Sequence, residues 1–271
     1  MEIKEADVDL FEDIETLIQK IELEPVDKDV NVIILKIHNP ALQTDEKSYN
    51  LSLMGKKMID WVKLAFNNNI TEIETDMKSD IISTIKPHLT ENKYTAVFYA
   101  DTPLLDRKTF LNIMDYMQIK RFEALKLERG YIFLTDYLKN SEHLQSINSC
   151  DLFKENFLTV FNMSQLELAN QILKNKIISY HQQKGVLIVD KNSTYIEADV
   201  KIGKNVIIYP NNAIMGTTEI DDNVVIEPFC TIKSSKIYKN NVLKQAYIEN
   251  SEIKEKENIK PFSYILNGVK K

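Results

Sequence analysis

The side chains that most often carry metal or acid–base chemistry are few in this sequence, and they stand apart from one another. None of the histidines has a second histidine four residues away or a nearby group of cysteines and aspartates at metal-ligand spacing. The four are His38, His88, His143 and His181. The two cysteines, Cys150 and Cys230, form no Cys-x-x-Cys pair. We therefore expect neither a zinc site nor a catalytic histidine, and we interpret these residues as surface or core positions.

An alternation of strands and helices indicates which elements must position any site. The run VNVIILKI at Val30–Ile37 is nearly continuous in apolar residues, as expected for a strand buried on both faces of a parallel sheet. The run YTAVFY at Tyr94–Tyr99 predicts a second buried strand, and Ile70–Glu74 predicts a third. Apolar residues at helical spacing predict helices over Met54–Phe66 and Asp80–His88. This order is typical of an α/β layer fold.

The region that follows is less regular. We interpret Gly130–Leu138 and Phe157–Phe161 as further strands, without assigning their order in the sheet. From Ser164 onward, a long apolar stripe predicts a helix that runs toward His181. Ser164 and Glu167 have the spacing of a capping box, so we expect the helix to begin there.

Isoleucine recurs at a strict period of six in the last third of the chain. It occupies Ile196, Ile202, Ile208, Ile214, Ile220, Ile226 and Ile232, and the period returns at Ile253, Ile259 and Ile265. Between these groups the spacing tightens to five or six through Ile237, Val242 and Ile248. A period of six fits a parallel β-helix of about four coils, in which each short face inserts one aliphatic side chain. Small or polar residues suit its tight corners; examples are Ala198, Gly203, Asn211 and Asp222.

A run of hairpins in a β-sandwich is the alternative, but it would show alternation and turns roughly every 8–12 residues. We therefore divide the chain into four segments. They are a helical extension over residues 1–28, with an apolar stripe from Leu10 to Ile21, an α/β domain over 29–163, a linker helix over 164–183 and a β-helix over 184–271. The ends of a β-helix expose strand edges. We expect the linker helix to cap one end and Gly268-Val-Lys-Lys to cap the other.

The composition narrows the classes of partner. A net charge of −6 argues against nucleic acid, which basic residues would have to hold. No stretch approaches the roughly 18 apolar residues that cross a bilayer, and Met1–Val8 carries no apolar signal region. Two distant cysteines fit a reducing compartment better than a disulfide framework. We expect a soluble, cytoplasmic protein with neither a membrane nor a nucleic acid partner.

One family pattern runs through several stretches of the chain. It covers KGVLIVDKNSTYIEADVKIGKNVIIYP at Lys184–Pro210, then Met215–Ile237 and Ile259–Ile265, and its Tyr-Gly-Asp-x-Pro-Leu strand end matches YADTPLL at Tyr99–Leu105. These stretches resemble bacterial N-acetylglucosamine-1-phosphate uridylyltransferase, a bifunctional family that also acetylates glucosamine-1-phosphate. The resemblance implies a Rossmann-like nucleotidyltransferase domain followed by a left-handed parallel β-helix. It also implies a homo-oligomer, since related β-helices usually form trimers.

Uridylyl transfer requires a backbone-lined pocket for a triphosphate, cations against its charge, and Mg²⁺ held by oxygen ligands. The family's loop Leu-Ala-Ala-Gly-x-Gly-Thr-Arg-Met falls on Ile34–Leu42, which reads ILKIHNPAL and keeps neither glycine. Its arginine falls on Ala41 and its later lysine on Ser48. Lys36 and Lys47 are therefore the candidates to contact phosphate in their place.

Asp101 matches the metal-binding aspartate of the family motif, and with Thr102 it is a candidate substrate contact. The family's second metal ligand, an asparagine, falls on Phe161, and Asn162 lies one position out of register. The family's uracil-binding motif falls on Thr75–Asp80, which does not match it. Two interpretations of Asp101 stay open. It contacts Mg²⁺ or a ligand, or it is a structural carboxylate bonded to neighbouring amides.

Three hypotheses for function remain. The first is a catalytically impaired protein that binds a sugar nucleotide, an NTP or a protein partner, including an intact relative that it would regulate. The second is an active sugar-1-phosphate nucleotidyltransferase that uses Asp101 for Mg²⁺ and Lys36 or Lys47 against phosphate. The third is a structural oligomerisation module. The family's acetyltransferase residues lie on coils beyond its Gly-Pro-Phe stretch, and this chain ends six residues after Ile265, so we expect no acetyltransferase site.

Overall fold

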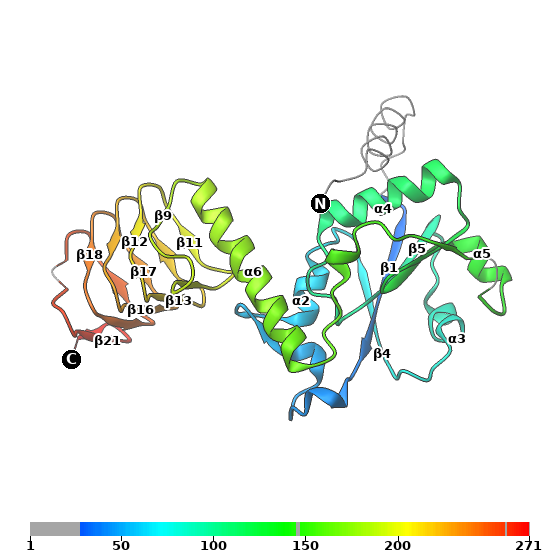
Figure 1. Cartoon of the computed structure of the whole chain (residues 1–271), viewed down its shortest axis with the longest axis horizontal. Coiled ribbons are helices and arrows are strands. Elements are labelled where there is room, and N and C mark those ends of the chain that lie inside the picture. Colours follow the sequence, from blue (N-terminus) through cyan, green and yellow to red (C-terminus); the bar gives the residue numbers. More distant parts are fainter. Residues whose placement is uncertain (1–27, 145–146, 258, 271) are drawn as a thin grey trace, which may run out of the picture. The chain divides into compact units, whose positions relative to one another are not determined.

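A computed structural model describes residues 28–144, 147–257 and 259–270 of the chain (Figure 1). The helix expected over Leu10–Ile21 lies outside these residues. The structure divides into two compact units. The first ends at Leu51 and resumes over Lys57–Gln165, and the second comprises Ser52–Lys56 and Leu166–Lys271. The fold class predicted from the sequence is confirmed, because the first unit is a Rossmann-like α/β domain and the second a short left-handed parallel β-helix.

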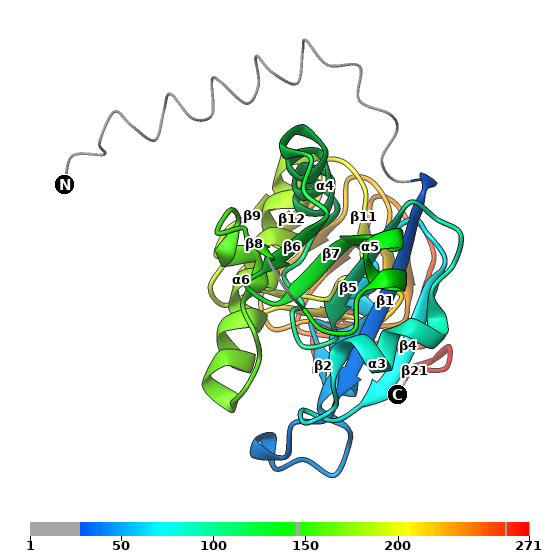
Figure 2. The ribbon, with the colours of Figure 1, turned by 90° about the vertical axis from the view of Figure 1, so that its right-hand side faces the viewer.

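The first unit is built on a six-stranded mixed sheet, whose order can be followed in Figure 2. From edge to edge the strands are β4 (Ile70–Thr75), β1 (Val30–Ile37), β5 (Tyr94–Tyr99), β7 (Gly130–Leu134), β6 (Ala124–Leu127) and β8 (Asn148–Ser149). Strand β1 pairs in parallel with both β4 and β5. Strand β7 is antiparallel to β5 and β6. The prediction that β1 is buried on both faces and lies between parallel neighbours is thus confirmed, although the sheet as a whole is mixed.

Strand β1 is apolar except at Asn31 and Lys36 because it supplies two separate cores. Val32 and Ile34 face one side of the sheet and Ile33 and Leu35 face the other, all four of them at 0–1% exposure. The first core also contains residues of α2 (Met58–Lys63) and α4 (Arg107–Lys120), and the second contains residues of α3 (Ile81–Ile85) and α5 (Thr135–Asn140). Each such buried aliphatic side chain contributes about 1.5–3 kcal/mol to folding. Helices on both faces therefore hold the strand ends in place.

The predicted helix over Met54–Phe66 is wrong at its start, because α2 begins only at Met58. The preceding residues form a hairpin of β2 (Ser52–Leu53) and β3 (Lys56–Lys57). Met54 and Gly55 turn the chain with φ of 47° and 83°, values that a right-handed helix excludes. The helical spacing of apolar residues extends across this turn, and Gly55 allows the chain to turn there because glycine adopts positive φ readily.

Two other predictions in this unit need correction. The strand assigned to Gly130–Leu138 stops at Leu134, where its partner β5 begins, and α5 follows because no strand remains to pair with. The strand assigned to Phe157–Phe161 is absent. A 3-10 turn over Lys154–Phe157 occupies its start. Helix α4 was not predicted, although Asp106 caps it by accepting a hydrogen bond from the Thr109 backbone N–H at 2.9 Å.

Helix α6 (Met163–Gln183) is the predicted long helix, but its cap lies earlier than expected. The Asn162 side-chain oxygen accepts from the Gln165 N–H at 2.9 Å, and the Gln165 side chain accepts from the Phe161 N–H at 2.8 Å. This is a capping-box arrangement two residues before the predicted pair, Ser164 and Glu167. Asn162 is thus the N-cap residue of α6.

The second unit coils into a β-helix with three parallel sheets as faces (Figure 1). The first face contains β9 (Leu187–Ile188), β12 (Ile207–Ile208), β15 (Val225–Ile226) and β18 (Val242–Leu243), and the second contains β11 (Lys201–Ile202), β14 (Glu219–Ile220), β17 (Lys236–Ile237) and β20 (Glu252–Ile253). The third contains β10 (Tyr195–Ile196), β13 (Ala213–Met215), β16 (Thr231–Lys233), β19 (Tyr247–Glu249) and β21 (Tyr264–Leu266), with β22 (Val269–Lys270) antiparallel at its end. Four strands on each of the first two faces agree with the expected coil number.

The isoleucines of the six-residue period form the core of this unit. Ile196, Ile214 and Ile232 pair in register and are fully buried. One position was assigned wrongly, because Leu243, at 0% exposure, points inward and the predicted Val242 is 43% exposed. A strand places neighbouring side chains on opposite faces, so a one-residue slip in the count reverses the assignment.

The corners of the coils contain residues with left-handed backbone. Asn205, Asn211, Asn223 and Asn240 have φ between 55° and 62°. Asparagine tolerates this region better than most residues, which explains its use at corners in place of glycine. At the first coil, Ile177 and Ile178 of α6 pack against the isoleucine core, and β22 folds back on the last coil. Among the described residues, no helix is long and apolar enough to span a membrane.

Candidate functional site

The carboxyl ends of β4, β1 and β5 meet at one edge of the sheet, where ligands bind in open α/β folds. From β1 the chain moves outward to β4, then crosses back to β5 on the other side of β1. Such a change of direction opens a crevice between the strand ends. A cavity of about 170 Å³ lies here, lined by the ends of these strands, by the loop Asp76–Ser79, by α3 and by Arg129.

Asp101, two residues beyond β5, is bound by Arg129. The guanidinium donates from Nη2 to Oδ2 at 2.7 Å and from Nε to Oδ1 at 3.2 Å, so both carboxylate oxygens are engaged. The two side chains are 13% and 21% exposed. A fork of this kind is among the strongest polar contacts in proteins, because both hydrogen bonds are charge-assisted. Asp101 also accepts from the Val160 N–H at its backbone oxygen, at 2.9 Å.

Two aromatic rings hold the other surfaces of Arg129. Its guanidinium carbon lies 3.8 Å from the centre of the Tyr99 ring and 5.5 Å from that of Phe161. Burial raises the pKa of Tyr99 to about 12, so this phenol stays neutral. Arg129 is placed by the tight turn between β6 and β7, in which Gly130 lies so close to β5 that a Cβ would be 2.8 Å from the Val97 oxygen. A side chain at position 130 would therefore require β5 or the turn that carries Arg129 to shift.

The structure engages the remaining predicted site residues in contacts within the chain. Thr102 is fully buried, and its hydroxyl donates to the Tyr99 backbone oxygen at 3.0 Å. Lys36 forms an ion pair with Glu72 at 3.3 Å, and Lys47 forms one with Glu74 at 3.4 Å. Contacts with Lys63 and then Lys36 hold the pKa of Glu72 below its usual range. Each of these predicted phosphate contacts therefore already has a carboxylate partner.

The loop after β1 closes on itself. Asn39 accepts from the Ala41 N–H through its side chain at 3.0 Å, and its backbone oxygen accepts from the Leu42 N–H at 3.3 Å. The Gln43 N–H donates to the Pro40 oxygen at 3.1 Å, while the Asn39 N–H donates to the Ser48 hydroxyl at 2.8 Å. Pro40 has no N–H to donate. These backbone N–H groups thus donate within the loop itself, whereas in a phosphate-binding loop the backbone N–H groups donate to the ligand.

The residues around Asp101 do not fit a bound Mg²⁺ ion. Magnesium takes oxygen ligands in near-octahedral geometry. Here both oxygens of Asp101 accept from Arg129, and the second predicted ligand position is the hydrocarbon ring of Phe161. Within the parts of the chain that the structure describes, no three His, Cys, Asp or Glu side chains gather as a metal site would require.

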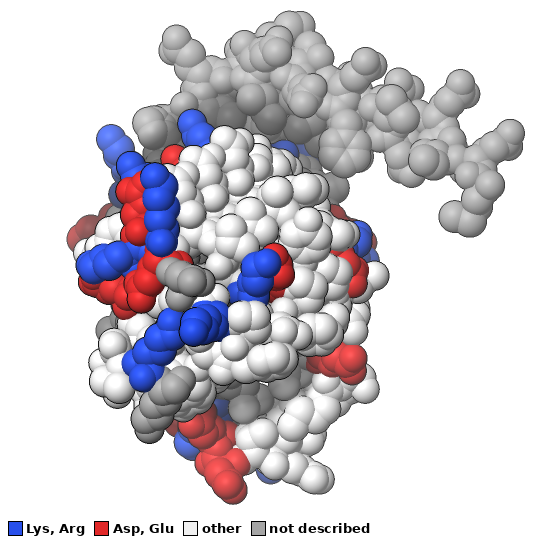
Figure 3. Space-filling view, turned by 90° about the vertical axis from the view of Figure 1, so that its left-hand side faces the viewer, with Lys and Arg blue, Asp and Glu red and all other residues white. Residues whose placement is uncertain are grey.

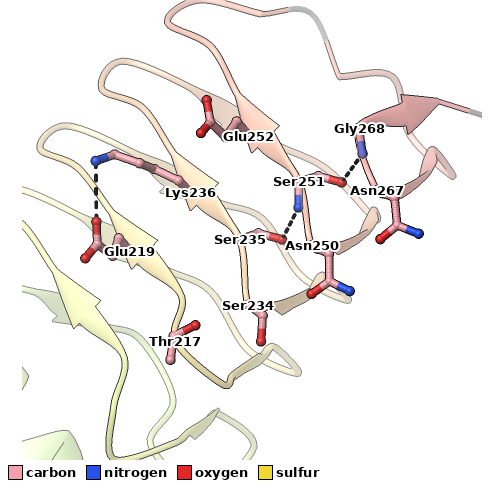
Figure 4. Close-up of a pocket in the computed structure, with 10 residues that line it drawn as sticks. All are labelled: Thr217, Glu219, Ser234, Ser235, Lys236, Asn250, Ser251, Glu252, Asn267 and Gly268. Carbon is pink, nitrogen blue, oxygen red and sulfur yellow. Dashed lines mark hydrogen bonds and ion pairs between the residues drawn. The ribbon is translucent and has the colours of Figure 1, made fainter.

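A second hollow lies on the β-helix, at the corner between the second and third faces (Figure 4). It measures about 610 Å³ and presents hydroxyl and amide side chains, one set for each coil. Its charged groups are paired along the second face, where Glu219 contacts Lys201 at 2.9 Å and Lys236 at 3.4 Å. No histidine or cysteine lines this groove, so it offers hydrogen bonds to a polar partner but no nucleophile with an adjacent base.

Arg129 was missed by the sequence reasoning. It lies in the short turn Glu128-Arg129-Gly130 between two strands, of which one was not predicted and the other was predicted too long. Turn residues that end in glycine are a hairpin signal, and that signal could have directed attention to Arg129. The loop Asp76–Ser79 was considered only as a failed match to a motif, yet it lines the cavity.

Comparison with known proteins agrees with this architecture. The model of the family "Bacterial transferase hexapeptide (six repeats)" matches residues 194–234. The chain is 34% identical over 138 residues to "Bifunctional protein GlmU" of Clostridium kluyveri, which covers 51% of this chain and 30% of that protein. With the protein of the same name from Clostridium beijerinckii it is 40% identical over 111 residues, covering 41% and 24% of the two chains.

Among solved structures, 4-diphosphocytidyl-2C-methyl-D-erythritolsynthase from Anaerococcus prevotii aligns with 55% of this chain and 99% of its own, at 8% identity. Its TM-score of 0.37 is too low to add to the sequence matches. The matched region spans only about 30% of the length of the first GlmU relative. Over about half of its length the chain is therefore similar to the GlmU proteins, and residues 194–234 match the hexapeptide repeats of bacterial transferases.

Proposed function

We propose that the α/β domain binds a sugar nucleotide without transferring a nucleotidyl group. The observation that carries this proposal is that the three candidate cations at the carboxyl edge, Lys36, Lys47 and Arg129, are all paired with carboxylates of the chain. Nucleotidyl transfer develops charge on phosphate oxygens, and free cations or metal ions must stabilise it. A site whose cations are already neutralised is poorly suited to that chemistry.

The crevice itself supports a binding role. Its cavity of about 170 Å³ suits one ring of a nucleotide, with the remainder of the ligand extending outside. Leu35 and Ile37 supply apolar surface, while Tyr99 and Arg129 supply polar groups. This mixture is typical of small-molecule pockets. The relation to GlmU proteins and the sequence resemblance to uridylyltransferases suggest UDP-N-acetylglucosamine as the first ligand to test.

Calorimetric titration with UDP-N-acetylglucosamine tests the binding role. We expect micromolar affinity that falls at least tenfold in Asp101→Asn, because the substitution breaks the fork that orients Arg129. Asp151→Asn is the matched control, since that carboxylate is 79% exposed and lies elsewhere on the same domain. No binding at millimolar ligand would refute the proposal.

Absence of turnover tests the catalytic half. We expect no sugar-phosphate-dependent release of pyrophosphate from any of the four NTPs, with or without Mg²⁺. Release that depends on Asp101 would overturn this part of the proposal and favour an active enzyme with a rebuilt site.

We also propose that the protein is cytoplasmic. Both cysteines are free and buried, and free thiols are typical of proteins in a reducing compartment.

A second role, assembly, is favoured by one face of the β-helix. The outward residues of the first face, which we term the apolar ladder, are Leu187, Ile207, Val225 and Val242, and they pair in register from coil to coil. Leu187 and Val242 are 57% and 43% exposed. On the second face the equivalent residues are Lys201, Glu219, Lys236 and Glu252. Figure 3 views the molecule from the side of the last β-helix coils, where charged side chains are densest at the upper left and uncharged surface lies to the right of them.

We propose that the apolar ladder is covered by another copy in a homotrimer. Contiguous apolar surface of this kind marks interaction sites. Light scattering should give three times the chain mass of 31.5 kDa, and Ile207→Glu should reduce it. Lys201→Glu on the second face is the matched control and should leave the mass unchanged. A monomer at micromolar concentration would refute this role.

A further inference from the structure

We infer that Arg129 is a built-in cation that replaces the metal ion at Asp101, so that the α/β domain binds its nucleotide ligand without Mg²⁺ and prefers a sugar nucleotide to a triphosphate. The part that concerns the ligand rests on the binding role proposed above. The part that concerns the metal rests on the contacts of Arg129 with Asp101, Tyr99 and Phe161, and it is independent of which ligand binds.

Arg129 lies between Asp101 and Phe161, the two positions on which the metal ligands of the resembled family fall. It is bidentate to Asp101, with N–O distances of 2.7 and 3.2 Å, and its guanidinium faces the Phe161 ring at 5.5 Å. An aromatic ring cannot coordinate Mg²⁺ as an amide oxygen does, but its face attracts a guanidinium. The change to phenylalanine and the presence of Arg129 therefore belong together.

Nearby groups that could restore a metal site are committed elsewhere. The Asn162 oxygen caps α6 through the Gln165 N–H at 2.9 Å, and Asn39 donates its side-chain N–H to the Phe161 backbone oxygen at 2.8 Å. Tyr99 supports the guanidinium from its other side at 3.8 Å. For a metal ion to reach Asp101, Arg129 would have to give up two charge-assisted hydrogen bonds and contacts with two rings.

The pair of Asp101 and Arg129 carries no net charge, which decides the class of ligand. Two of the five N–H groups of Arg129, one each on Nε and Nη2, donate to Asp101, and Arg129 lines the cavity, where its other N–H groups would donate to a phosphate oxygen. Lys36 and Lys47 add no excess charge because each has a glutamate partner. A diphosphate diester such as a sugar nucleotide carries about half the charge of a triphosphate, so its binding loses less from desolvation here.

Titrations with UDP-N-acetylglucosamine and with UTP, each in EDTA and in Mg²⁺, test the inference. We expect the affinity for UDP-N-acetylglucosamine to change less than twofold between the two conditions, and UTP to bind at least tenfold more weakly. Arg129→Met should lose at least tenfold in affinity, and Arg129→Lys should recover part of the loss as a cation without the planar fork. Arg121→Met, at an exposed position, is the control.

A metal-only experiment keeps the two proposals apart. Mn²⁺ added to the full chain should cause no selective broadening of the amide signals of Thr102 and Val160, which flank Asp101 in sequence or in space. Selective broadening there, or binding of UDP-N-acetylglucosamine that requires Mg²⁺, would overturn the inference while leaving a nucleotide-binding role intact. If neither nucleotide binds, the binding role fails, and the Mn²⁺ result alone decides whether Arg129 excludes a metal.

Discussion

In the β-helix each inward isoleucine meets the equivalent residue of the next coil, whereas the site of the α/β domain joins residues from segments with no common pattern. Ile214 pairs with residues 18 positions before and after it. Asp101 meets Arg129 across 28 positions, and the latter meets Phe161 from a third segment. A repeated contact leaves a period in the sequence, and a single contact leaves none. The β-helix is thus readable from spacing, while the site becomes visible only in three dimensions.

The largest effect is expected from the column of inward-pointing aliphatic residues that form the core of the β-helix. Leu243→Ala should lower the free energy of unfolding of the β-helix by about 2–5 kcal/mol, because it leaves a cavity in a closely packed core. Val242→Ala, one residue earlier, should change it by less than about 0.5 kcal/mol, since that side chain is 43% exposed. Urea unfolding followed by circular dichroism measures both. Equal effects would mean that the column is assigned to the wrong residue.

His181 allows the comparison to be tested by pH. It is 2% exposed in the last turn of α6, and burial, followed by the charge of Lys184, lowers its pKa to about 4. The unfolded chain binds the proton first, near pH 6.5, so stability should fall as the pH drops from 6.5 to 4. The full loss is about 3 kcal/mol at 1.36 kcal/mol per pH unit.

The pH dependence of unfolding, followed by urea titration, checks this effect of His181. His181→Leu should flatten the dependence within this interval. A variant that keeps the full slope would show that another group is responsible. His88→Leu is the control, because that residue lies outside the buried set.

Gly55 tests how tightly the hairpin segment Ser52–Lys56 is held within the second unit. Its φ is 83°, and a Cβ would come within 2.9 Å of the Glu197 carboxyl group, which accepts from the Gly216 N–H at 2.7 Å. Gly55→Ala should therefore cost about 1–3 kcal/mol. Gly185 has φ 91°, and no atom lies within 4 Å of an added Cβ. Gly185→Ala should therefore cost less, and it measures the effect of the positive φ without a steric clash. Thermal unfolding of the two variants measures the difference, and a smaller loss for Gly55→Ala would contradict the packing.

The smallest effect on stability is expected from the charged outward residues on the second face of the β-helix. Lys201→Ala removes one ion pair with Glu219 at 2.9 Å, but Lys201 is 77% exposed and Lys236 remains as a second partner. We expect a change in the free energy of unfolding within about 0.5 kcal/mol, which shrinks further in high salt. A loss above about 1 kcal/mol in urea titrations would show that this ladder stabilises the coil as much as the core does.

Much of the fold was predictable because its signals are local. The limits of β5 at Tyr94–Tyr99 are those read from the sequence, and the period of six located the β-helix. The strand assigned to Phe157–Phe161 failed because apolar residues there pack against the first core without pairing. The helix assigned from Met54 failed because a single turn at Gly55 interrupts an apolar spacing.

The candidate site was predictable only in part. Asp101 could be found because YADTPLL resembles a family motif, but its partner could not, since nothing in the sequence near Arg129 indicates a contact with Asp101. The ion pair of Lys36 depends in the same way on the register between β1 and β4, which places Lys36 opposite Glu74 and within reach of Glu72, two residues earlier on β4. Lys47 reaches Glu74 from the segment after β1. The metal and ligand assignments remain predictions until the titrations above are done.

The hairpin segment Ser52–Lys56 has a consequence for the order in which the protein folds during synthesis. The Met54 oxygen accepts from the Ala198 N–H at 3.0 Å, and its N–H donates to Asn170 at 3.1 Å. Ala198 is made about 140 residues after Met54, which at about 5–20 residues per second is roughly 7–30 s later. The chain therefore passes between the two units at Leu51, at Lys56 and again at Gln165. The segment Ser52–Lys56 therefore cannot complete its contacts within the second unit until the first coil of the β-helix has left the ribosome.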